Sequence, residues 1–157
     1  MPKWKMELNK MDSEYHTETE LKEIQKWNIK DAHNLIKRLK KIWRYKCCFV
    51  ERWKLDHIYK DRPILNLELH TAGYSGNEDI IKALQKHKLF WLMWWSKTER
   101  GGHYYFEIDY YTIGFKKVRL FAKENNITRQ YVSKVKDKFE WIKISHGKRL
   151  IRAVGKI

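Results

Sequence analysis

Residues 121–132 read FAKENNITRQYV, and this stretch combines the signals of a tight turn between two short helices. Asn126 stands where the first helix would end in a left-handed residue, a conformation that asparagine tolerates better than most residues. Thr128 is placed to cap the second helix. Close crossing of the helices needs a small side chain on the first and an apolar residue ten positions later, which are Ala122 and Val132. The spacing predicts a helix-turn-helix.

The second predicted helix has a buried face and an exposed face. Helical spacing places Tyr131, Val132, Val135 and Phe139 on the buried face. The exposed side chains are of the types that read base edges and hold phosphates, since arginine can pair with guanine and glutamine with adenine. They are Arg129, Gln130, Ser133, Lys134, Lys136 and Asp137. This face indicates contact with the major groove of duplex DNA, and a helical hairpin that only packs on a core is the alternative.

A predicted hairpin and a strong basic charge follow the two helices. Residues 141–145 and 148–154 alternate as strands around His146-Gly147, which would place three cations near DNA phosphates. They are Lys148, Arg149 and Arg152. Residues 111–157 hold 13 basic and 3 acidic side chains, whereas residues 1–110 hold 21 and 16. A charge that collects on one segment favours an anionic partner over a general role in solubility.

This segment resembles the excisionase-like winged helix-turn-helix modules that are common in phages and plasmids. The residues that carry the resemblance are 121–132, Ile142-Lys143-Ile144 and the run GKRLIR at 147–152. The resemblance implies that the residues from Thr128 to Lys136 enter the major groove and that Lys148-Arg149 touches the DNA backbone. The chain departs from the pattern by two extra residues, Ser145-His146, before the wing glycine, and this insertion affects how far the wing reaches.

The first 110 residues predict helices followed by a small sheet. Thr17 and Glu20 are spaced as a capping box, and Asn28 can cap a second helix that ends near residue 43. Strand-like stretches cover residues 47–55, 63–70, 89–96 and 103–109, interrupted by a helix with Ser75 and Glu78 as a second capping box. The predicted fold is α+β, with N-terminal helices and a mainly antiparallel sheet in residues 1–110 and the winged module in residues 111–157.

The aromatic run LFWLMWW at residues 89–95 has two interpretations. The simpler one is a central strand that is buried on both faces. The other is that one face stays partly open. Since tryptophan is enriched in binding hot spots, an open face would mark a docking surface for a host protein or the seam of a homodimer.

A metal site in the predicted sheet is a weaker alternative. Strand alternation places His70 on one face of its strand, and His103, Glu107 and Asp109 on one face of another. If these strands pair, the four side chains could hold a divalent metal ion for phosphodiester hydrolysis. Solvated sheet faces alternate in the same way without any site, and no metalloprotease, phosphate-loop or nucleophile-elbow motif is present. We therefore expect no cofactor and no enzymatic activity.

Length and composition suit a folded protein of one or two compact parts, with 157 residues, 43% hydrophobic and 34% charged side chains and a net charge of +15. No apolar run approaches the roughly 18 residues of a membrane span. The first residues, MPKWK, precede no apolar block of a signal peptide. Cys47 and Cys48 are adjacent and lack metal-ligand spacing. We expect a location in the cytoplasm of a host cell.

The central segment also resembles a set of small uncharacterised phage proteins, in LHTAGYSGNE at 69–78 and RGGHYYFEI at 100–108. The chain is thus predicted to be a phage-encoded regulator of transcription or recombination that binds double-stranded DNA through its winged helix. One alternative is a phage interaction protein that inhibits a host defence nuclease, as anti-CRISPR proteins do, with a basic module that regulates its own promoter or blocks a nucleic-acid site. A metal-dependent nuclease is the third possibility.

Overall fold

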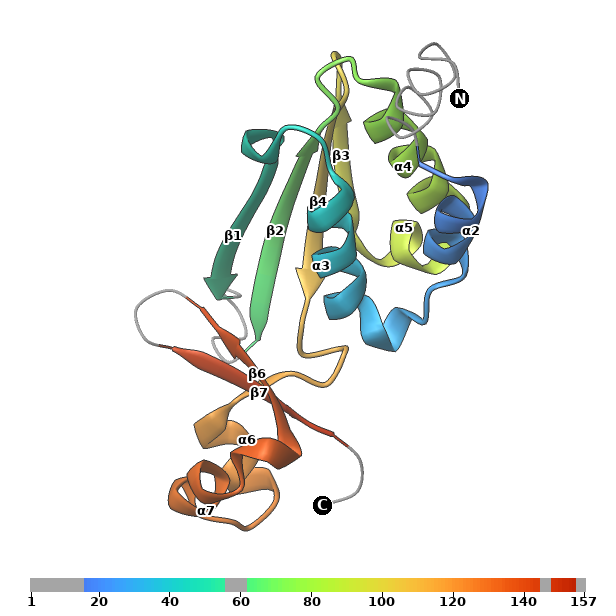
Figure 1. Cartoon of the computed structure of the whole chain (residues 1–157). Coiled ribbons are helices and arrows are strands. Elements are labelled where there is room, and N and C mark those ends of the chain that lie inside the picture. Colours follow the sequence, from blue (N-terminus) through green and yellow to red (C-terminus); the bar gives the residue numbers. More distant parts are fainter. Residues whose placement is uncertain (1–15, 56–61, 145–147, 155–157) are drawn as a thin grey trace. The chain divides into compact units, whose positions relative to one another are not determined.

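The computed structural model describes residues 16–55, 62–144 and 148–154 of the chain (Figure 1). Its internal packing divides the chain into two compact units. Unit 1 comprises Met1–Val50 and Leu67–Phe106, and unit 2 comprises Glu51–Asn66 and Glu107–Ile157. The predicted α+β class is confirmed, because helices accompany a four-stranded and a three-stranded antiparallel sheet. The predicted domain boundary at residue 110 stays a prediction.

Unit 1 begins with two helices whose starts follow from local sequence. Helix α2 spans Glu18–Lys26, and a 3-10 turn at Ile29–Asp31 leads into α3, Ala32–Ile42. The capping box is confirmed, since the Glu20 amide donates to Thr17 Oγ1 at 3.2 Å and the Thr17 amide donates to the Glu20 carboxylate at 3.1 Å. Asn28 caps the 3-10 turn by accepting from the amide of Lys30 at 3.0 Å. Apolar residues at helical spacing then fill the core.

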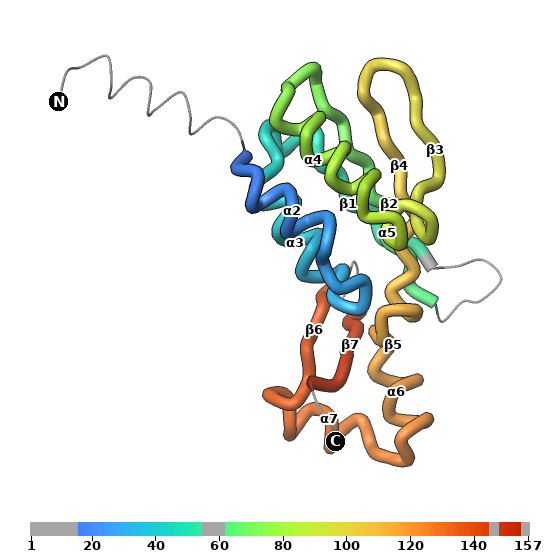
Figure 2. Tube along the Cα trace, turned by 90° about the vertical axis from the view of Figure 1, so that its right-hand side faces the viewer, coloured from blue at the N-terminus to red at the C-terminus, as the bar shows by residue number. Residues whose placement is uncertain are grey.

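The four-stranded sheet has the order β1-β2-β4-β3, with β1 at Phe49–Leu55, β2 at Pro63–His70, β3 at Trp95–Glu99 and β4 at His103–Asp109. Helices α2 and α3 lie on one side of this sheet, together with α4 (Ser75–Lys86) and α5 (Lys88–Trp94) (Figures 1 and 2). Burial alternates along β2, so that Leu65, Leu67 and Leu69 are buried while the residues between them are half-buried. One face of the sheet therefore carries the core and the other carries polar side chains.

The strand predicted at residues 89–96 is wrong, because residues 88–94 form helix α5 and β3 begins only at Trp95. Phe90 and Trp94 are four residues apart and both are buried, which a helix achieves by placing them one turn apart. The Phe90 ring lies 5.4 Å from that of Phe106 on β4, and its amide donates to His87 Nδ1 at 3.2 Å. A short apolar run fits a strand and a helix equally well, and here these contacts decide.

The second predicted capping box is also wrong. Helix α4 already includes Ser75, its N-cap is Tyr74, and no side chain caps it. The start of α4 is held instead by Asn77, which is fully buried and exchanges two 3.0 Å hydrogen bonds with the backbone of Arg44. Asn77 can make these bonds because its amide carries both a donor and an acceptor.

Unit 2 contains the three-stranded sheet, whose order is β5-β7-β6. Strand β5 is Lys116–Lys117, β6 is Phe139–Lys143 and β7 is Arg149–Ala153. Helices α6 (Val118–Glu124) and α7 (Arg129–Lys134) stand between β5 and β6 in the chain. A core of Phe121, Val132, Phe139 and Ile151 joins the helices to the sheet.

The turn between α6 and α7 has the expected local geometry. Asn126 is left-handed, with φ of 52°, and Thr128 Oγ1 accepts from the Tyr131 amide at 3.0 Å. Two details of the second helix differ from the prediction. Tyr131 is 40% exposed rather than buried, and Phe139 begins β6 instead of ending the helix. The chain leaves the helix at Val135 and makes a 3-10 turn at Lys136–Lys138, so that Phe139 enters the core from the sheet.

Candidate nucleic-acid interface

Helix α7 turns its polar side chains outward because Val132 is completely buried. At about 100° per residue, Gln130 and Lys134 each lie about 160° around the helix axis from Val132. Arg129, Gln130 and Ser133 are all exposed and together line a shallow depression of about 490 Å³. The structure therefore places the three predicted base-reading side chains on one surface.

The start of α7 is fixed by its cap. Thr128 is exposed, and its hydroxyl oxygen is used by the Tyr131 amide. The hydroxyl group can still donate a hydrogen bond to a phosphate oxygen. Thr128 therefore both anchors the helix and offers one further polar contact beside Arg129.

A second depression, of about 320 Å³, lies along the three-stranded sheet. It is lined by Lys136, Trp141, Ile142, Lys143 and Arg149. Lys143 and Arg149 are directly opposite each other on β6 and β7. Like charges in this position destabilise an antiparallel pair, so the arrangement is best tolerated when an anion lies between them. Lys136 belongs to the 3-10 turn before β6. Its backbone oxygen accepts a hydrogen bond from the Trp141 indole nitrogen at 3.0 Å.

The predicted wing residues have different surroundings. Lys148 and Arg149 are exposed, whereas the two extra residues Ser145-His146 lie outside the described residues. Arg152 is engaged within unit 2: its guanidinium lies 2.6 Å from the Glu140 carboxylate, donates to the oxygen of Ile113 at 3.3 Å and stacks over the Phe115 ring at 4.5 Å. These contacts give Arg152 a structural role rather than a place on the outer surface.

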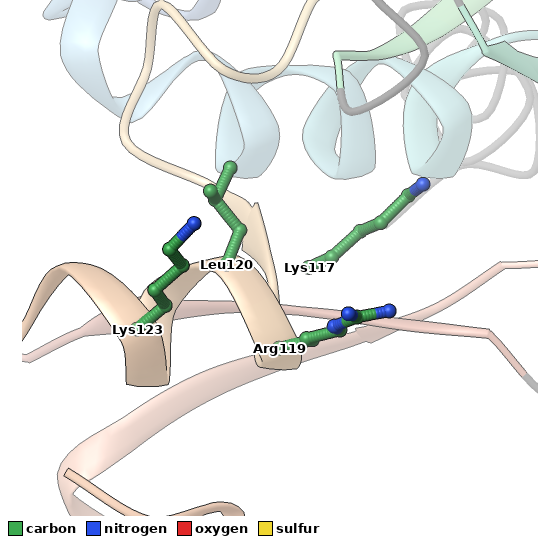
Figure 3. Close-up of a pocket in the computed structure, with 4 residues that line it drawn as sticks. All are labelled: Lys117, Arg119, Leu120 and Lys123. Carbon is green, nitrogen blue, oxygen red and sulfur yellow. The ribbon is translucent and has the colours of Figure 1, made fainter. Parts of the chain in front are cut away.

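A third depression, of about 370 Å³, lies on α6 and carries cations that the sequence reasoning missed. Lys117, Arg119 and Lys123 surround it together with Leu120 (Figure 3). Arg119 and Lys123 are spaced i, i+4, which places them on one helix face. That spacing was the available signal, and it also fits an ordinary solvated helix.

The few acidic side chains of residues 111–154 leave most of the positive charge of this segment uncompensated. Glu124 pairs with Lys116, and Glu140 pairs with Arg152, while Asp137 is exposed. The remaining cations of residues 111–154, apart from Lys117, form no ion pair with any described residue. They are Arg119, Lys123, Arg129, Lys134, Lys136, Lys138, Lys143, Lys148 and Arg149. Such a surface attracts an anionic polymer and raises its local concentration.

Of the four residues that the sequence suggested as metal ligands, the structure brings only His70 and His103 together. His70 and His103 face each other, with 2.7 Å between their Nδ1 atoms, and the Glu68 carboxylate lies 3.7 Å from His70 Nε2. Glu107 instead pairs with Lys54 at 2.8 Å and Asp109 with Arg62 at 2.6 Å. Within the described ranges, no group of three or more histidine, cysteine, aspartate or glutamate side chains could hold a metal ion.

No helix in the described part of the chain is long and apolar enough to cross a membrane. Comparison of the chain with protein-family models, curated proteins and solved structures found no match.

Proposed function

We propose that the chain is a phage-encoded regulator that binds duplex DNA through a winged helix-turn-helix formed by α6, α7 and the three-stranded sheet. The observation that carries this proposal is the outer face of α7, where Arg129, Gln130 and Ser133 share one open depression. The resemblance of residues 121–132, 142–144 and 147–152 to excisionase-like modules supports the assignment to phage DNA transactions.

In this proposal α7 enters the major groove. An α-helix with its side chains is about 10–12 Å across, which fits a groove roughly 12 Å wide. Arg129 and Gln130 are at the start of the helix, where recognition helices meet base edges. Arginine recognises guanine and glutamine recognises adenine through paired hydrogen bonds. Base reading is therefore assigned to the first turn of α7.

The hairpin and the 3-10 turn hold the DNA backbone. Lys136, Lys143 and Arg149 line one depression, and Lys148 stands beside Arg149 in the chain. A phosphate between Lys143 and Arg149 would relieve the repulsion between these two cations. No described carboxylate compensates their charge. These contacts position the duplex without reading its sequence.

The salt dependence of binding tests this proposal. Fluorescence anisotropy with a labelled random-sequence duplex should show log affinity falling with log salt by about 0.9 for each phosphate neutralised. Lys148→Ala should reduce that slope by about one unit. Lys37→Ala, which removes an exposed lysine of α3, is the matched control and should leave the slope unchanged. Binding that is insensitive to salt would reject a DNA-docking surface.

A further inference from the structure

Helix α5 and the residue after it expose an apolar surface, defined here as the α5 surface: Leu89, Leu92, Met93 and Trp95. Their exposed fractions are 54%, 81%, 47% and 44%. Among the described residues, only Tyr45, Tyr131 and Val154 are also large, hydrophobic and exposed, and none of them is near this stretch in the chain. Single exposed apolar residues are normal, whereas a cluster within seven consecutive residues marks an interaction site.

The α5 surface is held on a rigid support. Phe90 and Trp94 are buried and anchor the helix, so the exposed side chains are not needed to fill the core. The Trp95 ring stacks on Trp91, with 6.0 Å between ring centroids, and its indole nitrogen donates to Thr98 Oγ1 at 2.9 Å. A fixed aromatic side chain loses little conformational entropy on binding, which favours its use as an anchor.

The stretch of chain that contains the α5 surface is basic. Residues 82–98 contain four lysines and no acidic residue. Lys82 pairs with Asp79 and Lys97 with Glu99, whereas Lys86 and Lys88 are exposed and form no ion pair with a described residue. Two uncompensated cations beside an apolar cluster are complementary to an apolar segment flanked by carboxylates.

This positive charge disfavours two kinds of binding partner for the α5 surface, a second copy of the chain and an anionic membrane. A second copy of the chain carries +15 and would bring the same lysines to the contact. An anionic membrane is recognised through clusters of about four to eight lysines and arginines, more than the two that stand uncompensated here.

We propose that the α5 surface docks an acidic segment of another protein, one that presents large apolar side chains between aspartates or glutamates. The apolar side chains pack against Leu92 and Trp95, and the carboxylates face Lys86 and Lys88. None of these residues belongs to the DNA-binding surface proposed for unit 2.

A library of random peptides, panned against the full chain, tests this inference. The selected peptides should be enriched in aspartate, glutamate and large apolar residues. Leu92→Glu should weaken their binding by about tenfold or more, because it places a charge in the centre of the contact. Val154→Glu is the matched control, since it makes the same change at a residue that is 64% exposed in unit 2. It should leave peptide affinity unchanged.

Reversing the charge of the two lysines tests their contribution to peptide binding separately from that of the apolar side chains. Lys86→Glu with Lys88→Glu should weaken the same peptides and should leave duplex DNA binding unchanged. Failure to obtain peptides that depend on Leu92, or peptides without acidic enrichment, overturns the proposal. So does light scattering that shows a Leu92-dependent dimer, or Leu92-dependent binding to phosphatidylcholine vesicles that contain phosphatidylserine.

Discussion

The two sheets of the molecule differ in how charged side chains are paired at their exposed positions. On the four-stranded sheet, Lys97 lies 2.6 Å from Glu99, which also accepts from Tyr105 at 2.9 Å. On the three-stranded sheet, Lys143 stands opposite Arg149, and neither forms an ion pair with a carboxylate in the described part of the chain. The same two strands also hold the Glu140–Arg152 pair at 2.6 Å, so the contrast is confined to the Lys143–Arg149 position. The comparison suggests a criterion for the proposed binding surface: the pairing of the charges, more than their number, would distinguish it from a solvated surface.

The largest expected effect comes from reversing charge on the three-stranded sheet. Lys143→Glu with Arg149→Glu would replace two proposed phosphate contacts by repulsion, and we expect the affinity for every duplex to fall by about a hundredfold or more. Fluorescence anisotropy measures this loss. The matched control is Lys97→Glu on the four-stranded sheet, and a comparable loss in that variant would erase the contrast between the two sheets.

Single reversal at the same position sharpens the comparison through stability. Lys143→Glu would place a carboxylate opposite Arg149, and we expect the free energy of unfolding to rise by about 0.2 to 1 kcal/mol while DNA binding weakens. Urea denaturation measures the change. Lower stability in this variant would mean that the Lys143–Arg149 pair is not a source of repulsion.

Changes in the core of the C-terminal helices test the scaffold that carries the proposed interface. Ala122 is 4% exposed and Val132 is fully buried. Ala122→Leu should overpack the helix crossing and Val132→Ala should leave a cavity, each lowering the free energy of unfolding by about 1 to 3 kcal/mol. Thermal denaturation followed by circular dichroism checks both, and unchanged stability in the pair would contradict the packing described.

The smallest effect concerns an acidic group of unit 1 that is used for stability. The hydrogen bond from the Thr17 amide is the main cause that lowers the pKa of Glu20, and Arg38 adds to it. A lowered pKa contributes stability above the ordinary pKa of 4.5, and this contribution is lost as pH falls through the folded value. Glu20→Gln should therefore reduce the loss of stability on acidification below about pH 5, measured by urea denaturation at several pH values. An unchanged acid dependence would remove this role of Glu20.

Local signals allowed the two short helices before the C-terminal hairpin to be predicted, because Asn126 and Thr128 define a turn without help from distant residues. Helix α5 could not be predicted, since its conformation depends on the contact of Phe90 with Phe106. The same limit applies to Arg152, whose partner Glu140 lies on the neighbouring strand. Residue type indicates that a cation can bind phosphate, whereas only the fold shows whether another group already occupies it.

The most direct test of the central claim is to measure binding of two variants to a preferred duplex and to all its single-base substitutions. Gln130 points away from the core at the start of α7, whereas Lys136 lines the depression on the sheet. Gln130→Ala should cost about 1 to 3 kcal/mol on the preferred duplex and remove discrimination at one base pair. Lys136→Ala should weaken all the duplexes equally. Equal losses on every duplex for both variants, or no loss for either, would contradict base reading by α7.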